Sequence, residues 1–162
     1  MSFSKVLFVG LGGAGQRHLR IIRELLPSNV AYLAYRQTGA TPLLRQDFSV
    51  DEQNTVEKQY GLKTFDSLES AFAEGPDLTV ISTPTSYHRK PMMMAVDSGS
   101  GVFVEKPWAE SLEGFADFRD GIIAKDLPFM ISFQRRFHPL IARARKAVVS
   151  GAIGMPIAAT FT

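Results

Sequence analysis

The feature that most constrains this chain is a run of glycines directly after its first apolar segment. Residues Lys5 to Val9 predict a short buried strand, and Gly10, Gly12 and Gly15 follow it in the spacing G-x-G-x-x-G. From about Gln16 to Leu26, apolar side chains then recur at helical spacing. A strand, a glycine turn and a helix in this order predict backbone amides that can approach a pyrophosphate at the start of the helix.

Each glycine of the turn has its own expected role. Gly10 allows the tight turn, Gly12 permits close approach of the phosphate, and Gly15 lets the helix pack against the strand. We therefore predict that Gly10, Gly12, Gly13, Ala14 and Gly15 bind a dinucleotide cofactor. The alternative is an ordinary glycine-rich turn, since this spacing alone is a weak signal.

Strand and helix patterns alternate along the rest of the chain. The predicted strands are residues 5–9, 30–35, 63–65, 78–82, 102–105 and 129–133. Helices are expected after each strand, with Asp66 and Glu69 as a capping box, Ser111 as a cap and Pro139 at a helix start, while residues 37–51 read as a loop. The fold class predicted is α/β: a doubly wound parallel sheet of the Rossmann type in a three-layer αβα arrangement.

Composition limits the classes of protein to which this chain can belong. A formal net charge of +2 argues against nucleic-acid binding, and no apolar run is long enough to span a membrane. The amino terminus lacks a signal-peptide pattern, and the absence of cysteine agrees with a reducing compartment. We therefore expect a soluble, cytoplasmic protein, and no residue pattern predicts a metal site.

The end of the chain predicts the beginning of a second domain. We expect the dinucleotide-binding domain to occupy residues 1–150, and residues 151–162 to start a truncated second, substrate domain. Residues Met155 to Thr162 alternate apolar and small polar side chains, which predicts a strand with one buried face. A terminal strand of this kind more plausibly begins a further sheet than completes this one.

The end of the second strand bears on the choice of cofactor. An acidic residue there accepts hydrogen bonds from the adenine ribose of NAD, but this chain has Tyr35 and Arg36. An arginine can pair with a 2′-phosphate, so Arg36 favours NADP over NAD. The alternative is that Arg36 is a surface residue at a strand end.

Three further motifs follow the later strands. They comprise Ser82, Thr83, Pro84 and His88; then Glu105, Lys106 and Pro107; then Gln134, Arg135, Arg136, Phe137, His138 and Pro139. Together with the glycines and His18, they resemble the amino-terminal NAD(P)-binding domain of the Gfo/Idh/MocA oxidoreductases. The resemblance covers essentially the whole chain, and the Glu-Lys-Pro tripeptide is its most specific part.

The resemblance implies roles for the residues at the predicted sheet edge. Lys106 would lie beside the nicotinamide and the reacting hydroxyl as the catalytic residue, orienting substrate and assisting proton transfer. Pro107 would fix the backbone of the lysine, and Glu105 would have a positional role. Thr83 and Pro84 would wall the cofactor cleft. His88 would lie close to the nicotinamide, although a capping or packing histidine fits the sequence nearly as well.

Two hypotheses of function from different classes follow. The first is the cofactor-binding part of an NADP-preferring sugar or polyol oxidoreductase, which transfers hydride to or from a secondary alcohol carbon. The family's second domain, with its aspartate and histidine pair, does not lie within these residues, so the chain alone is expected to lack the full catalytic site. The second hypothesis is a non-catalytic NADP-binding sensor or partner module. Homo-oligomer formation stays open, and neither a nucleic-acid nor a membrane partner is expected.

Overall fold

The structure is a computed structural model that describes residues 3–36, 39 and 41–160. The chain divides into two compact units, residues 1–132 and 133–162. The first unit contains all strands of the main sheet. The predicted start of a second domain near residue 151 lies within the second unit and stays a prediction.

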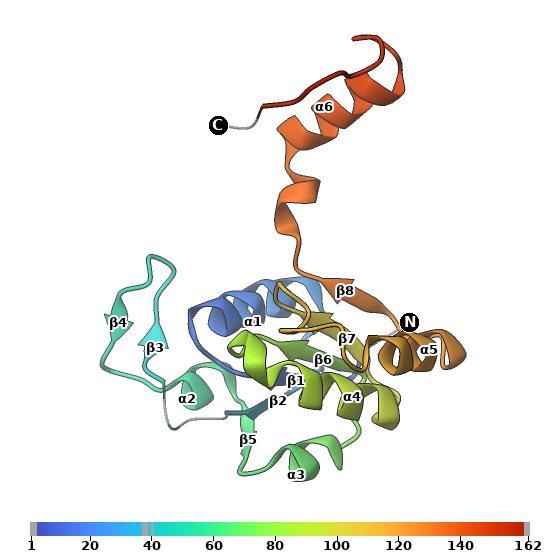
Figure 1. Ribbon diagram of the computed structural model, residues 1–162. Helices are drawn as coiled ribbons and strands as arrows, with labels where there is room; N and C mark the ends of the chain where they lie inside the picture. The colour runs from blue at the N-terminus through green and yellow to red at the C-terminus, as the bar shows by residue number, and fades with distance from the viewer. Residues whose placement is uncertain (1–2, 37–38, 40, 161–162) are drawn as a thin grey trace. The chain divides into compact units, whose positions relative to one another are not determined.

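The first unit is built on a six-stranded parallel sheet (Figure 1), whose strand order is β5-β2-β1-β6-β7-β8. Its strands are β1 (Lys5–Val9), β2 (Ala31–Tyr35), β5 (Lys63–Phe65), β6 (Leu78–Ile81), β7 (Gly101–Val104) and β8 (Phe129–Ile131). The chain begins in the middle of the sheet, builds outward to β5 and then returns to the other side of β1. The order therefore reverses between β1 and β6, and the predicted Rossmann-like α/β fold is confirmed.

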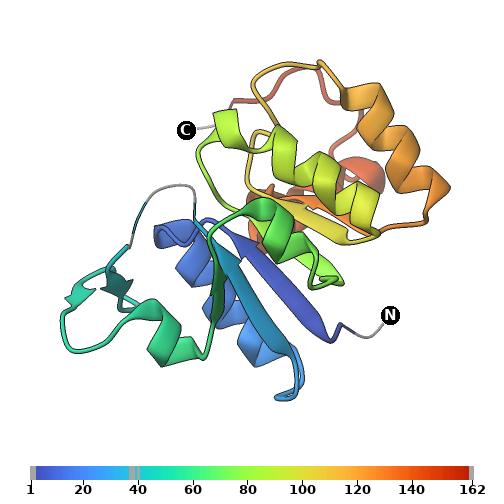
Figure 2. The ribbon, with the colours of Figure 1, turned by 90° about the horizontal axis from the view of Figure 1, so that it is seen from below.

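Helices cover both faces of this sheet. They are α1 (Gly13–Leu25), α2 (Val56–Tyr60), α3 (Leu68–Phe72), α4 (Arg89–Ser98) and α5 (Phe115–Ala124), with a short 3-10 helix over Thr85–Tyr87. Figure 2 shows α3 and α4 in front of the strands and α1 behind them. The sheet is thus the middle of three layers, which is why its strands carry apolar residues on both sides.

Two hydrophobic cores lie on opposite faces of the sheet because side chains alternate along each strand. In β1, Val6 and Phe8 belong to the core that includes Leu19 of α1, whereas Leu7 and Val9 belong to the core that includes Met92 of α4. All four β1 side chains are at most 1% exposed. The strand that carries the glycine turn is therefore packed on both faces.

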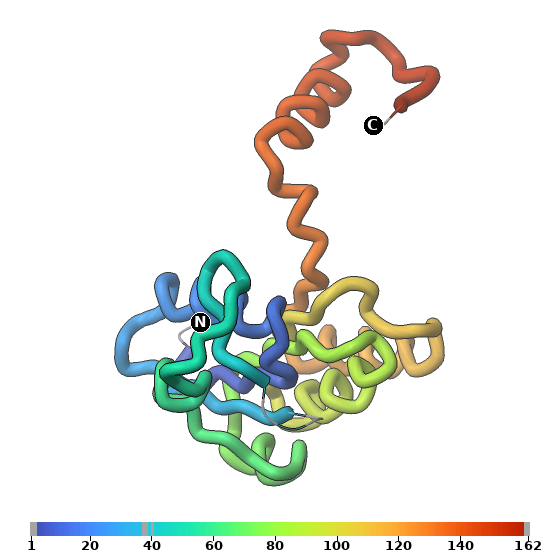
Figure 3. Tube along the Cα trace, turned by 90° about the vertical axis from the view of Figure 1, so that its left-hand side faces the viewer, coloured from blue at the N-terminus to red at the C-terminus, as the bar shows by residue number. Residues whose placement is uncertain are grey.

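The segment predicted as a loop after β2 contains a two-stranded antiparallel hairpin, β3 (Leu43–Leu44) and β4 (Val50–Asp51). This hairpin can be followed in teal in Figure 3. It is tied to α1 through Gln16 and through Arg20, whose Nη1 donates to the Leu44 carbonyl at 3.0 Å. Residues 37, 38 and 40 of the predicted loop lie outside the described residues.

Two predicted helix caps are wrong. At the start of α3, the side chain of Ser67, and not that of Asp66, accepts a hydrogen bond from the amide of Ser70. Ser67 takes the cap because its backbone has the extended conformation that an N-cap requires. Ser111 does not cap α5, which begins after Gly114, and its hydroxyl instead accepts a hydrogen bond from Arg89.

The second unit contains a 3-10 helix over Gln134–Phe137 and α6 (Pro139–Val149). Pro139 opens α6 as predicted, and the His138 ring accepts the amide of Leu140. The strand predicted from Met155 onward is absent from residues 155–160, because no neighbouring strand among the described residues takes up its backbone hydrogen bonds. Residues 161 and 162 lie outside the described residues.

Across the described ranges, no helix is both long and apolar enough to cross a membrane. The same residues contain no group of three or more His, Asp or Glu side chains placed to hold a metal ion.

Candidate functional site

The glycine turn and the motifs that follow β6 and β7 meet at the carboxyl edge of the sheet, whereas the motif from Gln134 to Pro139 lies in the second unit. Gly10 follows β1, Ser82 and Thr83 follow β6, and Glu105 follows β7. Adjacent strand ends are joined by backbone hydrogen bonds, from Gly10 to the Tyr35 carbonyl and from Ser82 to the Val9 carbonyl, each at 2.9 Å. The site therefore lies where the strand order reverses, which is the usual ligand crevice of an open α/β sheet.

The glycine turn has the geometry of a phosphate cradle. Gly10 has φ +91°, a backbone conformation that residues with a side chain rarely adopt. A Cβ on Gly15 would lie 2.4 Å from the Gly10 carbonyl oxygen, so α1 packs directly on the turn. A Cβ on Gly12 would meet no protein atom within 4 Å, which leaves open space at the start of α1. The backbone amides of the first turn of a helix border such a space, so it is a candidate position for a pyrophosphate.

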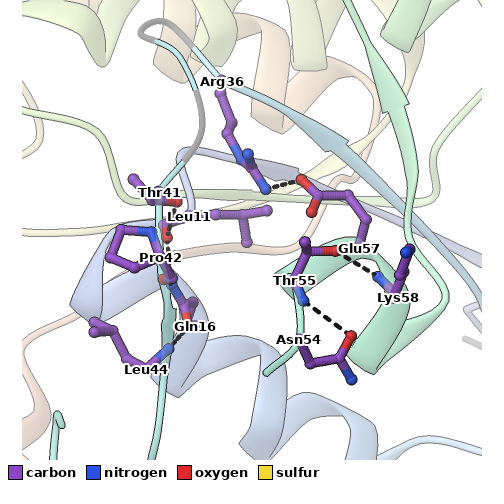
Figure 4. Close-up of polar contacts among 10 residues, drawn as sticks. All are labelled: Leu11, Gln16, Arg36, Thr41, Pro42, Leu44, Asn54, Thr55, Glu57 and Lys58. Carbon is purple, nitrogen blue, oxygen red and sulfur yellow. Dashed lines mark hydrogen bonds and ion pairs between the residues drawn. The ribbon is translucent and has the colours of Figure 1, made fainter. Parts of the chain in front are cut away.

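Two polar side chains hold the turn in place. The Ser82 hydroxyl donates to the Gly10 carbonyl at 2.9 Å. The Gln16 amide, which is fully buried, donates to the carbonyls of Leu11 and Pro42 and accepts the Leu44 amide (Figure 4). Gln16 thereby ties the glycine turn to the β3–β4 hairpin, so the hairpin stands beside the cradle.

Thr83 brings a free hydroxyl to the same edge. Its Oγ1 is buried and has no hydrogen-bond partner among the described residues. The residue lines a hollow of about 260 Å³ together with Val9, Tyr35, Tyr87 and Lys90. A buried hydroxyl without a partner is costly, so this atom is a candidate to bond a ligand polar group.

His88 joins two loops of the edge. Its ring is only 1% exposed, with Nε2 2.8 Å from the Thr83 carbonyl and Nδ1 3.0 Å from the Pro107 carbonyl. Carbonyl oxygens can only accept, so each tautomer of the ring donates its N–H to one of these two carbonyls. Its burial and these two contacts give His88 a role in positioning the backbone, and its place close to the nicotinamide stays a prediction.

Glu105 is likewise engaged by the protein. Its Oε1 lies 2.7 Å from Nε2 of His18, on α1, and the carboxylate also accepts the Lys106 amide. Burial raises the pKa of Glu105, but the hydrogen bonds from His18 and Ser132 outweigh it and leave the pKa below its ordinary value. An ionised Glu105 therefore holds α1 and the β7 loop together, in keeping with its predicted positional role.

Lys106 is exposed beyond the end of β7, and the peptide bond that joins it to Pro107 is cis. Because Glu105 is fixed by His18 and Pro107 by His88, the backbone on both sides of Lys106 is held. The lysine side chain projects from this held segment at the edge that also carries the cradle. Its ammonium has no partner in the described ranges and can serve as a donor to a ligand oxygen.

Arg36 follows β2 as predicted, but it is paired. Its Nη2 donates to Oε1 of Glu57, near the start of α2 (Figure 4). The Arg36 side chain is 15% exposed, and its Nε is buried without a partner among the described residues. The carboxylate that the sequence lacks at the strand end is thus supplied by a helix that begins twenty residues later.

Sequence reasoning missed Gln16 and Glu57 as parts of this site. Gln16 interrupts the apolar face of a predicted helix, which is the one local signal that a buried polar contact could give. Glu57 gives no such signal, because a glutamate in the first turn of a helix is common on protein surfaces.

A sequence model of an oxidoreductase family with an NAD-binding Rossmann fold matches residues 4–131. The scyllo-inositol 2-dehydrogenase (NAD(+)) of Bacillus subtilis (strain 168) is 28% identical over 151 residues, which are 92% of this chain and 41% of that protein. The D-xylose 1-dehydrogenase (NADP(+)) of Hypocrea jecorina is 26% identical over 100 residues, or 61% of this chain and 26% of that protein. The names of the relatives thus include both cofactors.

Solved structures share the fold. The scyllo-inositol dehydrogenase from Lactobacillus casei, crystallised with NAD(H) and scyllo-inositol, matches with a TM-score of 0.74 at 24% identity. The match covers 95% of this chain and 43% of that one. The chain therefore spans about two-fifths of the length of the two scyllo-inositol dehydrogenases.

Proposed function

The chain belongs to the Gfo/Idh/MocA oxidoreductase family, and from this membership we propose that it binds NADP for hydride transfer involving a sugar or polyol. The observation that carries the proposal is the cradle at the start of α1. Gly12 leaves open space there, Gly15 packs against the Gly10 carbonyl, and the buried hydroxyl of Thr83 nearby has no partner in the described part of the chain. Family membership supplies the reaction class, and the inositol and xylose dehydrogenases among the relatives supply the substrate class.

Each residue of the edge has a proposed part in binding. The amides of Gly12, Gly13 and Ala14 hold the pyrophosphate, assisted by the helix dipole. Thr83 and Pro84 line the cleft toward the nicotinamide end. When bound, the cofactor supplies the hydride acceptor or donor.

Lys106 is the proposed catalytic residue. Its ammonium donates a hydrogen bond to the substrate hydroxyl and stabilises the negative charge that develops on that oxygen as the carbon is oxidised. The lysine can do this reproducibly because Glu105 and Pro107 are anchored on either side of it. His18 and His88 act through these neighbours as positioning residues.

The preference for NADP is assigned to Arg36. A guanidinium at the end of β2 matches a 2′-phosphate in charge and shape. The absence of cysteine fits a cytoplasmic setting for this function.

The proposal is tested by isothermal titration of the purified chain with NADPH and with NADH, after circular dichroism has confirmed folding. NADPH is expected to bind about tenfold more tightly than NADH, a difference of about 1.4 kcal/mol. Arg36→Gln is expected to remove most of this difference by weakening NADPH alone. A folded sample that releases no heat with either dinucleotide would refute the proposed function, and an undiminished preference in the variant would refute the role of Arg36.

A further inference from the structure

The ion pair between Arg36 and Glu57 lies beside the glycine turn. Arg36 directly follows Tyr35, whose carbonyl accepts the Gly10 amide at 2.9 Å. The guanidinium is thus one residue beyond the strand that borders β1 on the carboxyl edge. This is the region in which a Rossmann domain distinguishes the ribose of the adenine half of its cofactor.

The surroundings of the pair form a small charged hollow. Its volume is about 270 Å³, and its lining residues are Ala34, Arg36, Gly39, Glu57, Thr64, Phe65 and Asp66. The lining therefore includes two acidic residues and one arginine. An incoming phosphate dianion would meet one attractive and two repulsive charges there.

Glu57 is held in position by its helix. Thr55 caps α2, its side chain accepting the Lys58 amide, and Glu57 stands in the first turn with its side chain 31% exposed. The carboxylate takes a hydrogen bond from Nη2 of Arg36, while Nε of the same guanidinium has no partner among the described residues. Part of the arginine's donor set is thus already occupied by Glu57.

Resting on the proposed function, we propose that Glu57 sets the balance between NADP and NAD. A 2′-phosphate has to share Arg36 with the Glu57 carboxylate and to sit close to its negative charge. A ribose that carries a free 2′-hydroxyl gains from the same carboxylate, which can accept the hydrogen bond that a strand-end acid accepts in other Rossmann domains. Glu57 thus opposes Arg36: it weakens NADP and supports NAD.

The test is Glu57→Gln, which keeps the size of the side chain and removes its charge. Affinities for NADPH and NADH are measured by isothermal titration, together with adenosine 2′,5′-bisphosphate and adenosine 5′-monophosphate as probes of the adenosine end alone. NADPH and the bisphosphate are expected to bind about tenfold more tightly, since a neighbouring partly buried charge is worth about that factor. NADH is expected to bind unchanged or up to about threefold more weakly.

Glu74→Gln is the matched control. Glu74 also pairs with a cation, with its Oε1 2.7 Å from Nζ of Lys63, and it lies at the opposite, amino edge of the sheet. This variant changes the net charge equally and is expected to leave all affinities within about twofold. If Glu57→Gln shifts NADPH and NADH by the same factor, or shifts neither, the inference is overturned.

The double variant separates competition from simple repulsion. In the Arg36→Gln background, Glu57→Gln is expected to change NADPH affinity by less than about threefold, because the contested partner is gone. If NADPH affinity still rises tenfold in that background, Glu57 does not act by competing with the phosphate for Arg36. A wild-type chain that binds neither dinucleotide would instead refute the proposed function, so the two failures are distinguishable.

Discussion

Replacing Gly12 and Gly15 separately by alanine should divide cofactor binding from folding. Both glycines belong to the same short turn, but a methyl group would meet different surroundings at each. At Gly15 the new Cβ would lie 2.4 Å from the Gly10 carbonyl oxygen and 2.6 Å from the Ser82 hydroxyl oxygen. At Gly12 it would have no protein atom within 4 Å, and the backbone there, at φ −66°, suits any residue.

The expected losses of stability follow from these contacts. The Gly10 oxygen is backbone and cannot rotate away, so in Gly15→Ala the helix α1 must shift, at a cost of about 1–3 kcal/mol. The hydrogen bond from Ser82 to Gly10 is disturbed too, worth about 1 kcal/mol, while the helix preference of alanine returns about 1 kcal/mol. The net expectation is a loss of about 2 kcal/mol in the free energy of unfolding. For Gly12→Ala the expected change is within about 0.5 kcal/mol, because a modestly poorer cap offsets a stiffer unfolded chain.

Urea denaturation followed by circular dichroism measures stability, and isothermal titration with NADPH measures binding. Gly12→Ala should unfold like the wild type and yet bind NADPH at least about thirtyfold more weakly, or about 2 kcal/mol, because its methyl group occupies the space proposed for the pyrophosphate. A Gly12→Ala chain that binds NADPH normally would show that the phosphate lies elsewhere. A Gly15→Ala chain of wild-type stability would show that α1 does not pack on the turn as described.

Three further predictions concern the remaining contacts. In a form of the protein that oxidises its substrate, Lys106→Met should lower kcat by about a hundredfold or more, while cofactor affinity changes less than about threefold. Lys63→Met is the surface control, and an unchanged kcat in Lys106→Met would show that Lys106 takes no part in the chemistry. His88→Leu should lower the free energy of unfolding by about 2–3 kcal/mol in urea titrations, since the buried carbonyls of Thr83 and Pro107 lose the ring whose N–H bonds one of them, and wild-type stability would contradict that role. A hydrogen bond from the Ser4 hydroxyl, helped by two backbone amides, holds the pKa of Asp77 below its usual value. The stabilisation by ionised Asp77 is therefore complete above the pKa of about 4 that the group has in the unfolded chain, and it is lost as pH falls through the lower pKa of the folded chain. The cost of Asp77→Asn in the free energy of unfolding, roughly 1 kcal/mol at pH 7, should then shrink toward pH 2. A cost that stays constant with pH would contradict this role of Asp77.

Local patterns in the sequence determined the main elements of this fold. The apolar run of Lys5 to Val9, the glycines after it and the helical spacing beyond them each depend on residues close together in the chain. Parallel strands joined by helices then leave few arrangements, so the carboxyl edge could be predicted as the place where Ser82, Thr83 and the Glu-Lys-Pro motif meet.

Tertiary structure alone decided which partners these side chains take. Nothing near Arg36 in the sequence indicates that Glu57 pairs with it, and nothing near His88 indicates that its ring lies between the carbonyls of Thr83 and Pro107. Such contacts depend on how separate elements pack, which periodicity and local propensity do not encode. The sequence by itself therefore determined where a dinucleotide should bind, whereas the folded chain decided which charges surround the position proposed to select it.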